Sequence, residues 1–199
     1  MSHSIQFPDE PSQGGEFKRQ DDAFRAWIRA DGSTPYAPES GRYHLYVSLA
    51  CPWAHRTIIV RQLKRLEPVI GLTAVDPVRG HEGWAFRDGL GHSQDPINGF
   101  TYLREAYLAT DPGYRGRWTV PVLWVKQMRR IVNNSEDDLC RMFNDEFKSV
   151  SSSNSIDLFP VALSREQEAL SDTTRRTRRL PRLWRAEFTR RSPRGSPCR

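Results

Sequence analysis

The sequence predicts an α/β fold in which short buried strands alternate with helices. Three observations lead to this prediction. Runs rich in aromatic and β-branched residues recur at 42–47, 70–75 and 119–125, and such runs favour strands. Segments with apolar residues at helical spacing lie between and after these runs. The pair Cys51-Pro52 directly follows the first run, and proline is favoured at the first position of a helix.

A polar, turn-rich lead-in over residues 1–40 precedes the domain. Within it, residues 21–30 have the spacing of an amphipathic helix, carried by Phe24, Trp27 and Ile28. The first strand is followed by a short loop and by a helix that begins at Pro52 and runs to about Leu66. The apolar face of this helix is predicted to consist of Ile58, Ile59 and Leu63.

The later elements complete a recognisable order. They are a strand at 70–75, a long loop rich in glycine and histidine at 76–98, a helix at 99–109, strands at 119–125 and 131–132, and a helix at 135–147. The resulting order, β-α-β-α-β-β-α, is that of a thioredoxin-like domain, for which we predict bounds of 41–147.

Pro121 interrupts the third predicted strand, because proline cannot donate a backbone hydrogen bond to a sheet. A cis peptide bond between Val120 and Pro121 resolves the conflict, and cis bonds are retained mainly where a turn or a site requires them. A trans proline at the first residue of the strand is the alternative. With a cis bond, the N–H and C=O of Val120 are left to pair with an extended peptide ligand.

Cys51 is the candidate nucleophile. It lies at the start of a helix, where unpaired N–H groups and the helix dipole favour the thiolate form of a cysteine. A dithiol oxidoreductase carries its second cysteine three residues later, and here that residue is Ala54. The reacting thiol must therefore come from outside the protein, and glutathione is the candidate. An inert buried cysteine is the alternative interpretation.

Ser135 and Glu136, at the start of the last predicted helix, are candidates to bind the γ-glutamyl end of glutathione. They supply a hydroxyl group, helix N–H groups and a carboxylate, which match an amine and a carboxylate. Ser135 could also be a plain helix cap, and the two roles are compatible.

The other cysteines and the histidines are predicted to form no further site. Cys140 is expected in the core and Cys198 exposed in the tail. Three cysteines without short spacing suggest neither a disulfide framework nor a zinc site, and no metal is predicted. The first thirty residues contain no apolar signal segment, and no stretch is apolar enough to span a bilayer, so we expect a cytoplasmic protein without a membrane partner.

Four stretches of the sequence resemble the glutathionyl-hydroquinone reductases, which are the Xi-class, omega-like glutathione transferases. These stretches are Gly41–Arg56, which contains Cys-Pro-Trp-Ala-His-Arg, Gly83–Phe86, Arg117–Trp124 and Ile131–Asn134, and the resemblance covers about 23–170. It implies the thioredoxin-like N-terminal domain of a glutathione transferase, with glutathione as co-substrate. The implied activity removes glutathione from glutathionyl-hydroquinone conjugates through a mixed disulfide at Cys51.

The resemblance also implies which residues contact glutathione. Trp84 would lie against it, and Ser135 and Glu136 would hold its γ-glutamyl end. The segment that leads into the third strand would bind it through backbone and side chains, namely those of Arg117, Trp118, Thr119 and Val120. Trp84 could instead anchor its own loop, and His55 and Arg56 are expected behind the site. The family has glutamate before serine at the γ-glutamyl anchor, whereas this chain has the reverse order.

The C-terminal residues depart from the family. Its members continue with an all-helical domain that forms a homodimer, and 156–160 and 166–170 resemble only the start of that domain. After Asp172 the helical period is lost, and residues 171–199 contain ten arginines and two acidic residues in a chain whose net charge is +6. We predict a linker, a helical remnant and an Arg-rich tail over 148–199, produced by truncation or a frameshift. A flexible polybasic arm that binds RNA or acidic partners is the alternative, and nucleic acid is expected only through this tail.

Three functions therefore stand after the sequence alone. The first is the reductase that the resemblance implies. The second is a non-catalytic glutathione-binding fragment, and the third is a glutaredoxin-like deglutathionylase. Loss of the helical domain would also leave an apolar face of the thioredoxin-like part exposed, which predicts poor solubility.

Overall fold

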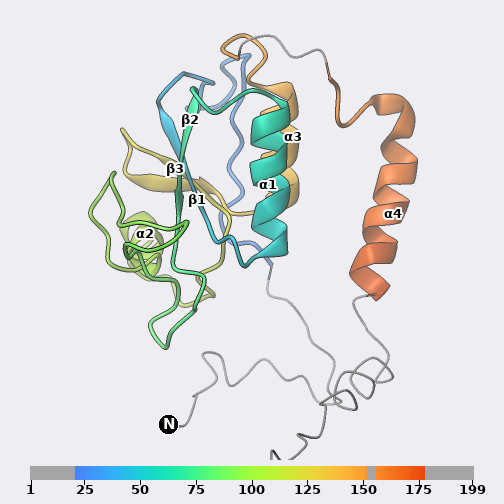
Figure 1. The fold of residues 1–199 in the computed structure, drawn as a ribbon. Helices are drawn as coiled ribbons and strands as arrows, with labels where there is room; N and C mark the ends of the chain where they lie inside the picture. Colours follow the sequence, from blue (N-terminus) through green and yellow to red (C-terminus); the bar gives the residue numbers. More distant parts are fainter. Residues whose placement is uncertain (1–20, 152–155, 178–199) are drawn as a thin grey trace, which may run out of the picture. The chain divides into compact units, whose positions relative to one another are not determined.

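The computed structural model describes residues 21–151 and 156–177 (Figure 1). The chain divides into two compact units, Met1–Asp157 and Leu158–Arg199. The elements of the first unit are β1 (Tyr43–Val47), α1 (Pro52–Leu63), β2 (Ile70–Ala74), α2 (Arg104–Thr110), β3 (Val122–Val125), β4 (Arg130–Asn133) and α3 (Glu136–Asp145). The second unit contains the 3-10 helix η1 (Val161–Leu163) and the helix α4 (Ser164–Thr177).

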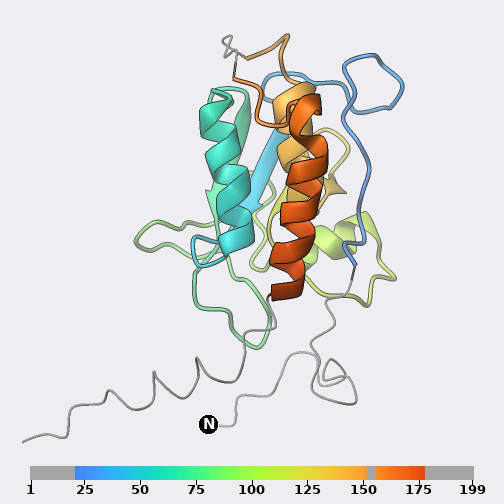
Figure 2. The ribbon, with the colours of Figure 1, turned by 90° about the vertical axis from the view of Figure 1, so that its right-hand side faces the viewer.

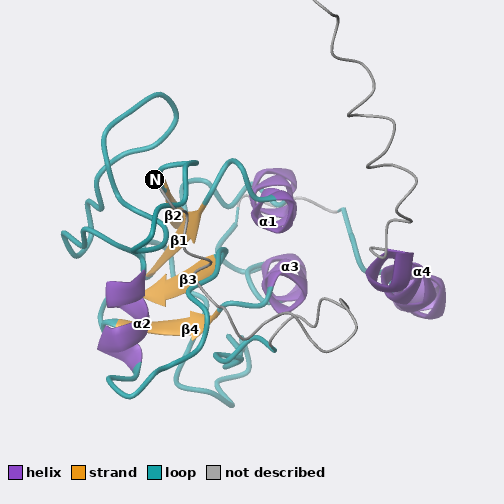
Figure 3. Cartoon of the chain, turned by 90° about the horizontal axis from the view of Figure 1, so that it is seen from below, coloured by secondary structure: helices purple, strands orange, loops and turns teal. Residues whose placement is uncertain are grey.

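One four-stranded sheet with the order β2-β1-β3-β4 forms the centre of the first unit. β1 and β2 are parallel, and β3 is antiparallel to both of its neighbours. α1 and α3 pack against each other over one face of the sheet, and α2 lies on the other face (Figures 1 and 3). Figure 2 shows the axes of α1 and α3 running along the same direction in front of the strands. The predicted element order and the thioredoxin-like fold are confirmed.

The core lies on both faces of the sheet, so β1 is buried along its whole length. Tyr43 points toward α3, where its ring meets Phe147 edge-on at 5.9 Å between centroids. Tyr46 points to the opposite face and contacts Phe86 of the long loop at 5.1 Å. This two-sided burial explains why the strand reads as a continuous aromatic and aliphatic run rather than as an alternating one.

The predicted buried face of α1 is wrong. Ile59 and Leu63 are 52% and 42% exposed, and Ile58 is half-buried. The buried residues are instead Ala54, Thr57, Val60 and Arg61. Small side chains allow the helix to approach its neighbours closely, and the Arg61 guanidinium group donates hydrogen bonds to the carbonyl oxygens of Ile70 and Glu67. A charged side chain can be buried here because backbone acceptors satisfy it.

The predicted amphipathic helix at 21–30 is also wrong. This segment is extended and pairs with the outer edge of β4 through an isolated bridge between Arg25 and Asn133. The N–H of Ala26 donates to Val132 and the N–H of Asn134 donates to Phe24, both at 3.0 Å. An uncovered strand edge offers unpaired backbone groups, and pairing with them outweighs the helical spacing.

Among the helix bounds, the start of α2 and the end of α4 differ most from the prediction. α2 begins at Arg104 rather than Gly99, because the carboxylate of Asp95 accepts the backbone N–H groups of Ile97, Asn98 and Phe100 and holds that stretch in turns. α4 continues to Thr177, past the point where the helical pattern was expected to end. Residues 171–177 contain no glycine or proline, and arginine is a good helix former.

Some predictions lie outside the described residues, namely the lead-in before Asp21, Cys198 and the tail 178–199. Within the described part of the chain, no helix is long and apolar enough to cross a membrane.

Candidate functional site

Cys51 lies between β1 and α1, at the N-cap position of α1 and directly before Pro52. A tight turn brings it there, since its N–H donates to the carbonyl of Ser48 at 3.0 Å. Its carbonyl accepts the N–H of His55 at 3.1 Å and so starts the helix. The thiol makes no cap hydrogen bond and lies close to the positive end of the helix dipole. Cys51 is 8% exposed, so the residue is largely buried.

Val120 faces this thiol. Its carbonyl oxygen lies 3.9 Å from Cys51 Sγ, close enough for a weak S–H donor contact. The Val120–Pro121 peptide bond is cis, which confirms the prediction for this bond. Within residues 21–151 and 156–177, the N–H of Val120 has no hydrogen-bond partner. A backbone donor and a backbone acceptor are therefore available beside the thiol, as pairing with an extended peptide requires.

Ser135 is the N-cap residue of α3, and it is buried. Its side chain makes no cap hydrogen bond, whereas its own N–H donates to Asn133 Oδ1 at 2.7 Å. The hydroxyl group is thus not used as a cap for its own helix. The first turn of α3 also contains three acidic residues in succession, starting with Glu136.

Arg56 connects the helix that follows Cys51 to the start of α3. Its guanidinium group lies 2.7 Å from Asp137 Oδ1 and 3.9 Å from Glu136 Oε1. Glu136 is buried, and the Arg56 guanidinium group lies within ion-pair distance of its carboxylate. The charge of Arg56 is therefore directed toward the start of α3, where the predicted γ-glutamyl anchor lies.

Thr119 is held within the protein. The hydroxyl group of Tyr107 donates to the Thr119 carbonyl at 2.9 Å and accepts the Thr119 N–H at 3.1 Å. The Thr119 side chain accepts a hydrogen bond from Asn134 Nδ2 at 3.2 Å. Its backbone groups are thus already paired, so within this stretch Val120 is the residue that can offer its backbone to a ligand.

Trp84, Arg117 and Trp118 lie on the loops that precede α2 and β3. Trp84 lies in the long loop, where its carbonyl accepts the N–H of Leu103 and the guanidinium group of Arg79 stacks over its ring at 5.6 Å. The carbonyl of Arg117 accepts a hydrogen bond from the Tyr114 hydroxyl at 2.9 Å. These contacts fix the loops that carry the predicted side chains.

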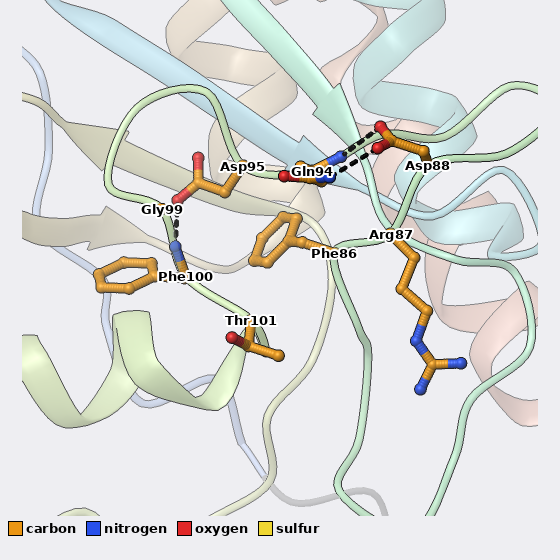
Figure 4. A pocket seen from close by; sticks show the side chains of 8 residues that line it. All are labelled: Phe86, Arg87, Asp88, Gln94, Asp95, Gly99, Phe100 and Thr101. Carbon is orange, nitrogen blue, oxygen red and sulfur yellow. Dashed lines mark hydrogen bonds between the residues drawn. The ribbon is translucent and has the colours of Figure 1, made fainter.

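A separate pocket of about 340 Å³ lies by the long loop (Figure 4). None of the predicted site residues lines it, and its walls are formed by Phe86, Arg87, Asp88, Gln94, Asp95, Gly99, Phe100 and Thr101. The polar groups in it are largely occupied, because Gln94 donates to Asp88 and Asp95 accepts the Phe100 N–H. Its charged groups thus serve the loop's own structure.

Cys140 is fully buried in α3, which confirms its predicted place in the core. Burial raises the pKa of its thiol to about 12. Among residues 21–151 and 156–177, no group of three or more histidine, cysteine or acidic side chains is placed to hold a metal ion.

Two buried polar residues of the site were missed from the sequence. Tyr107 was read only as an apolar marker of its helix, and Asn134 only as part of a motif. A tyrosine on a buried helix face needs a partner for its hydroxyl group, and an asparagine at the end of a buried strand needs partners for its amide. These requirements could have predicted a polar contact, although not which residues make it.

Comparisons with known proteins identify relatives of this chain. A scan against models of protein families found no match. The chain is 44% identical over 170 residues to the glutathionyl-hydroquinone reductase YqjG of Escherichia coli strain K12, which is 82% of this chain and 52% of that protein. The glutathione-bound structure of YqjG, a glutathione transferase homolog, covers 75% of this chain with a TM-score of 0.72 and 44% identity, and 51% of that chain is matched.

A second solved structure gives the same result. The glutathione transferase Xi from Phanerochaete chrysosporium matches 78% of this chain and 53% of its own, with a TM-score of 0.75 and 43% identity. The chain spans about half the length of the curated relatives it matches. Over that half the chain is similar in fold and sequence to the Xi-class glutathione transferases and the glutathionyl-hydroquinone reductases.

Proposed function

We propose that this chain is a glutathione-dependent reductase in which Cys51 removes glutathione from glutathionyl-hydroquinone conjugates. The observation that carries the proposal is the place of the Cys51 thiol, at the N-terminus of α1 and facing the backbone of Val120. The names of the related proteins support the substrate class, since two of them are glutathionyl-hydroquinone reductases.

The proposed reaction has two displacement steps at sulfur. The thiolate of Cys51 attacks the glutathione sulfur of the conjugate, an S–S bond forms, and the bond between that sulfur and the ring carbon breaks. The electron pair of the broken bond takes up a proton at the ring carbon, which releases the hydroquinone. A second glutathione thiolate then attacks the mixed disulfide, so glutathione disulfide leaves and the Cys51 thiolate is restored. In total, two glutathione sulfurs are oxidised to a disulfide, and the ring carbon of the conjugate is reduced as its C–S bond is replaced by a C–H bond.

The proposed glutathione site extends from Cys51 to the start of α3. The cysteinyl part of glutathione would pair with the N–H and C=O of Val120, which places its sulfur next to Cys51 Sγ. The γ-glutamyl amine would meet the buried carboxylate of Glu136, and the γ-glutamyl carboxylate would meet the Ser135 hydroxyl and the N–H groups at the helix start. Trp84, Arg117 and Trp118 would contact the remainder from their loops, and Thr119 would contribute by holding Val120 in place.

The experiment measures hydroquinone release from a glutathionyl-menadiol conjugate in excess glutathione. Wild-type protein is compared with Cys51→Ala, and with Cys140→Ala as the matched control, because Cys140 is a second thiol that is fully buried within α3. We expect release by the wild type and by the control, and none above background for Cys51→Ala. Release by Cys51→Ala at the wild-type rate would refute the role of this cysteine.

Intact-mass analysis separates the remaining alternatives. A mixed disulfide at Cys51 without hydroquinone release would indicate a glutathione-binding protein without turnover. Removal of glutathione from a glutathionylated peptide, but not from the menadiol conjugate, would indicate a glutaredoxin-like activity. The reaction requires a supply of reduced glutathione, so a reducing compartment such as the cytoplasm suits it.

A further inference from the structure

A buried tyrosine hydroxyl lies between the two halves of the proposed glutathione site. Tyr107, on α2, is fully buried, and its hydroxyl group lies within 2.9 to 3.2 Å of four polar atoms. Three of these atoms belong to Thr119, directly before Val120, and the fourth is the side-chain amide of Asn134, directly before Ser135. One hydroxyl group thus contacts the chain next to both proposed binding elements.

Asn134 completes the connection. Its Nδ2 donates to the Tyr107 hydroxyl and to Thr119 Oγ1, both at 3.2 Å, and its Oδ1 accepts the N–H of Phe24 at 3.0 Å. The N–H of Asn134 also donates to the Phe24 carbonyl. The extended segment at 21–30 therefore covers this connection, and the Phe24 ring packs on Tyr107 at 5.6 Å.

Because these hydrogen bonds are buried, losing one of them costs more than losing a hydrogen bond at the surface. Desolvation raises the pKa of Tyr107, so its hydroxyl group keeps its proton and can donate. Asn134 is also buried. If one residue of this hydrogen-bonded group is removed, water cannot replace the hydrogen bonds that the remaining residues lose. The segments that hold Val120 and Ser135 come from the approach to β3 and from the turn after β4, and this side-chain cluster ties them together.

We infer that Tyr107 and Asn134 are positioning residues that set the distance between the Val120 backbone and the Ser135–Glu136 anchor, so that a ligand carrying a γ-glutamyl group can engage both at once. The inference rests on the proposed function. It predicts that loss of the Tyr107 hydroxyl slows the reaction of Cys51 with ligands that span both elements, and leaves the reaction with ligands that reach only Val120 unchanged. Only the first kind of ligand gains from a fixed distance between the two elements.

Disulfide exchange at Cys51 tests this distinction without requiring turnover. The full chain is mixed with glutathione disulfide, or with the disulfide of cysteinylglycine, which lacks the γ-glutamyl group, and mass spectrometry follows the mixed disulfide at Cys51. Each exchange releases one thiol for each mixed disulfide formed. The ratio of the two second-order rate constants is the selectivity for the γ-glutamyl group.

Tyr107→Phe is compared with Tyr43→Phe, which also removes a buried tyrosine hydroxyl bonded to a backbone carbonyl, that of Ala37, but on β1. We expect the selectivity of Tyr107→Phe to fall about tenfold, with its rate for the cysteinylglycine disulfide within twofold of wild type. Asn134→Ala should show a similar fall, and the double variant should lose little more than either single variant, because the two residues act as one unit.

The outcomes distinguish failure of the glutathione site from failure of the positioning role of Tyr107 and Asn134. If wild-type protein has no selectivity for glutathione disulfide, the glutathione site itself is wrong and the inference falls with it. If wild-type protein is selective but Tyr107→Phe and Tyr43→Phe keep that selectivity equally, the site stands and the positioning role is refuted. A uniform fall in both rates for Tyr107→Phe, without a change in their ratio, also refutes it, because that result would show a general structural defect.

Discussion

Acid destabilisation through His44 is the stability prediction that the structure makes most directly. His44 lies buried in β1, where its Nε2 is 2.8 Å from Thr73 Oγ1 on the neighbouring strand. Its ring occupies the space above Gly71, where a Cβ atom would clash with it. Burial lowers the pKa of His44 to about 4, against 6.5 for an unperturbed histidine, and the nearby carboxylate of Asp95 opposes this shift without cancelling it.

The sign and size of the effect follow from proton linkage. Between pH 4 and pH 6.5 the unfolded chain binds a proton at His44 that the folded chain does not, so the free energy of unfolding rises with pH across this window. It changes by up to about 1.4 kcal/mol per pH unit, which gives a loss of about 2 kcal/mol between pH 7 and pH 5. Above pH 6.5 the contribution is complete, and below pH 4 it no longer changes.

Urea unfolding of wild type and His44→Gln at pH 7 and pH 5 measures this term, with His81→Gln as the control because His81 is exposed. Between pH 7 and pH 5, the free energy of unfolding of His44→Gln should fall by about 2 kcal/mol less than that of wild type, whatever the stability of the variant at pH 7. The control should follow wild type within about 0.5 kcal/mol. Equal pH dependence in wild type and His44→Gln would show that His44 is not held neutral by burial, and the reasoning would fail.

Three further predictions concern reactivity and stability. Cys140 should react with iodoacetamide at pH 8 at least about a thousandfold more slowly in native than in denatured protein, since burial raises its pKa to about 12; comparable rates in a peptide-mapping assay would contradict this. Asp138→Ala should cost about 1–3 kcal/mol in urea unfolding and speed hydrogen exchange at 21–30, because its carboxylate accepts two hydrogen bonds from Arg25 at 2.6 and 2.8 Å; unchanged exchange would count against it. Leu123→Ala in the fully buried β3 should lower the free energy of unfolding by about 2–5 kcal/mol, whereas Ile59→Ala should change it by less than about 1 kcal/mol. A larger loss for Ile59→Ala would indicate that Ile59 is buried after all.

Much of the candidate site could be placed from local sequence. A strand, Cys51 and Pro52 in succession put a thiol at a helix N-terminus, since each of these preferences acts over a few residues. The conflict between Pro121 and its strand similarly pointed to the cis bond next to Val120.

The errors have a common cause in long-range contacts. The apolar spacing at 21–30 is compatible with a helix, but the open edge of β4 and the Asp138 carboxylate, more than 100 residues away, make the extended form better paired. On α1, Ile59 satisfied a local pattern, yet close packing and the backbone acceptors near Arg61 selected the other face.

The sequence by itself determined the order of the elements, the fold class and the helix start that carries Cys51, because strand and helix preferences and proline positions are properties of neighbouring residues. Only the tertiary structure decided which face of α1 is buried, that the lead-in is extended, and that Tyr107 and Asn134 join the two halves of the proposed site. The physical reason is that burial and hydrogen-bond satisfaction depend on partners brought together from distant parts of the chain, and a local pattern contains no information about which partner arrives.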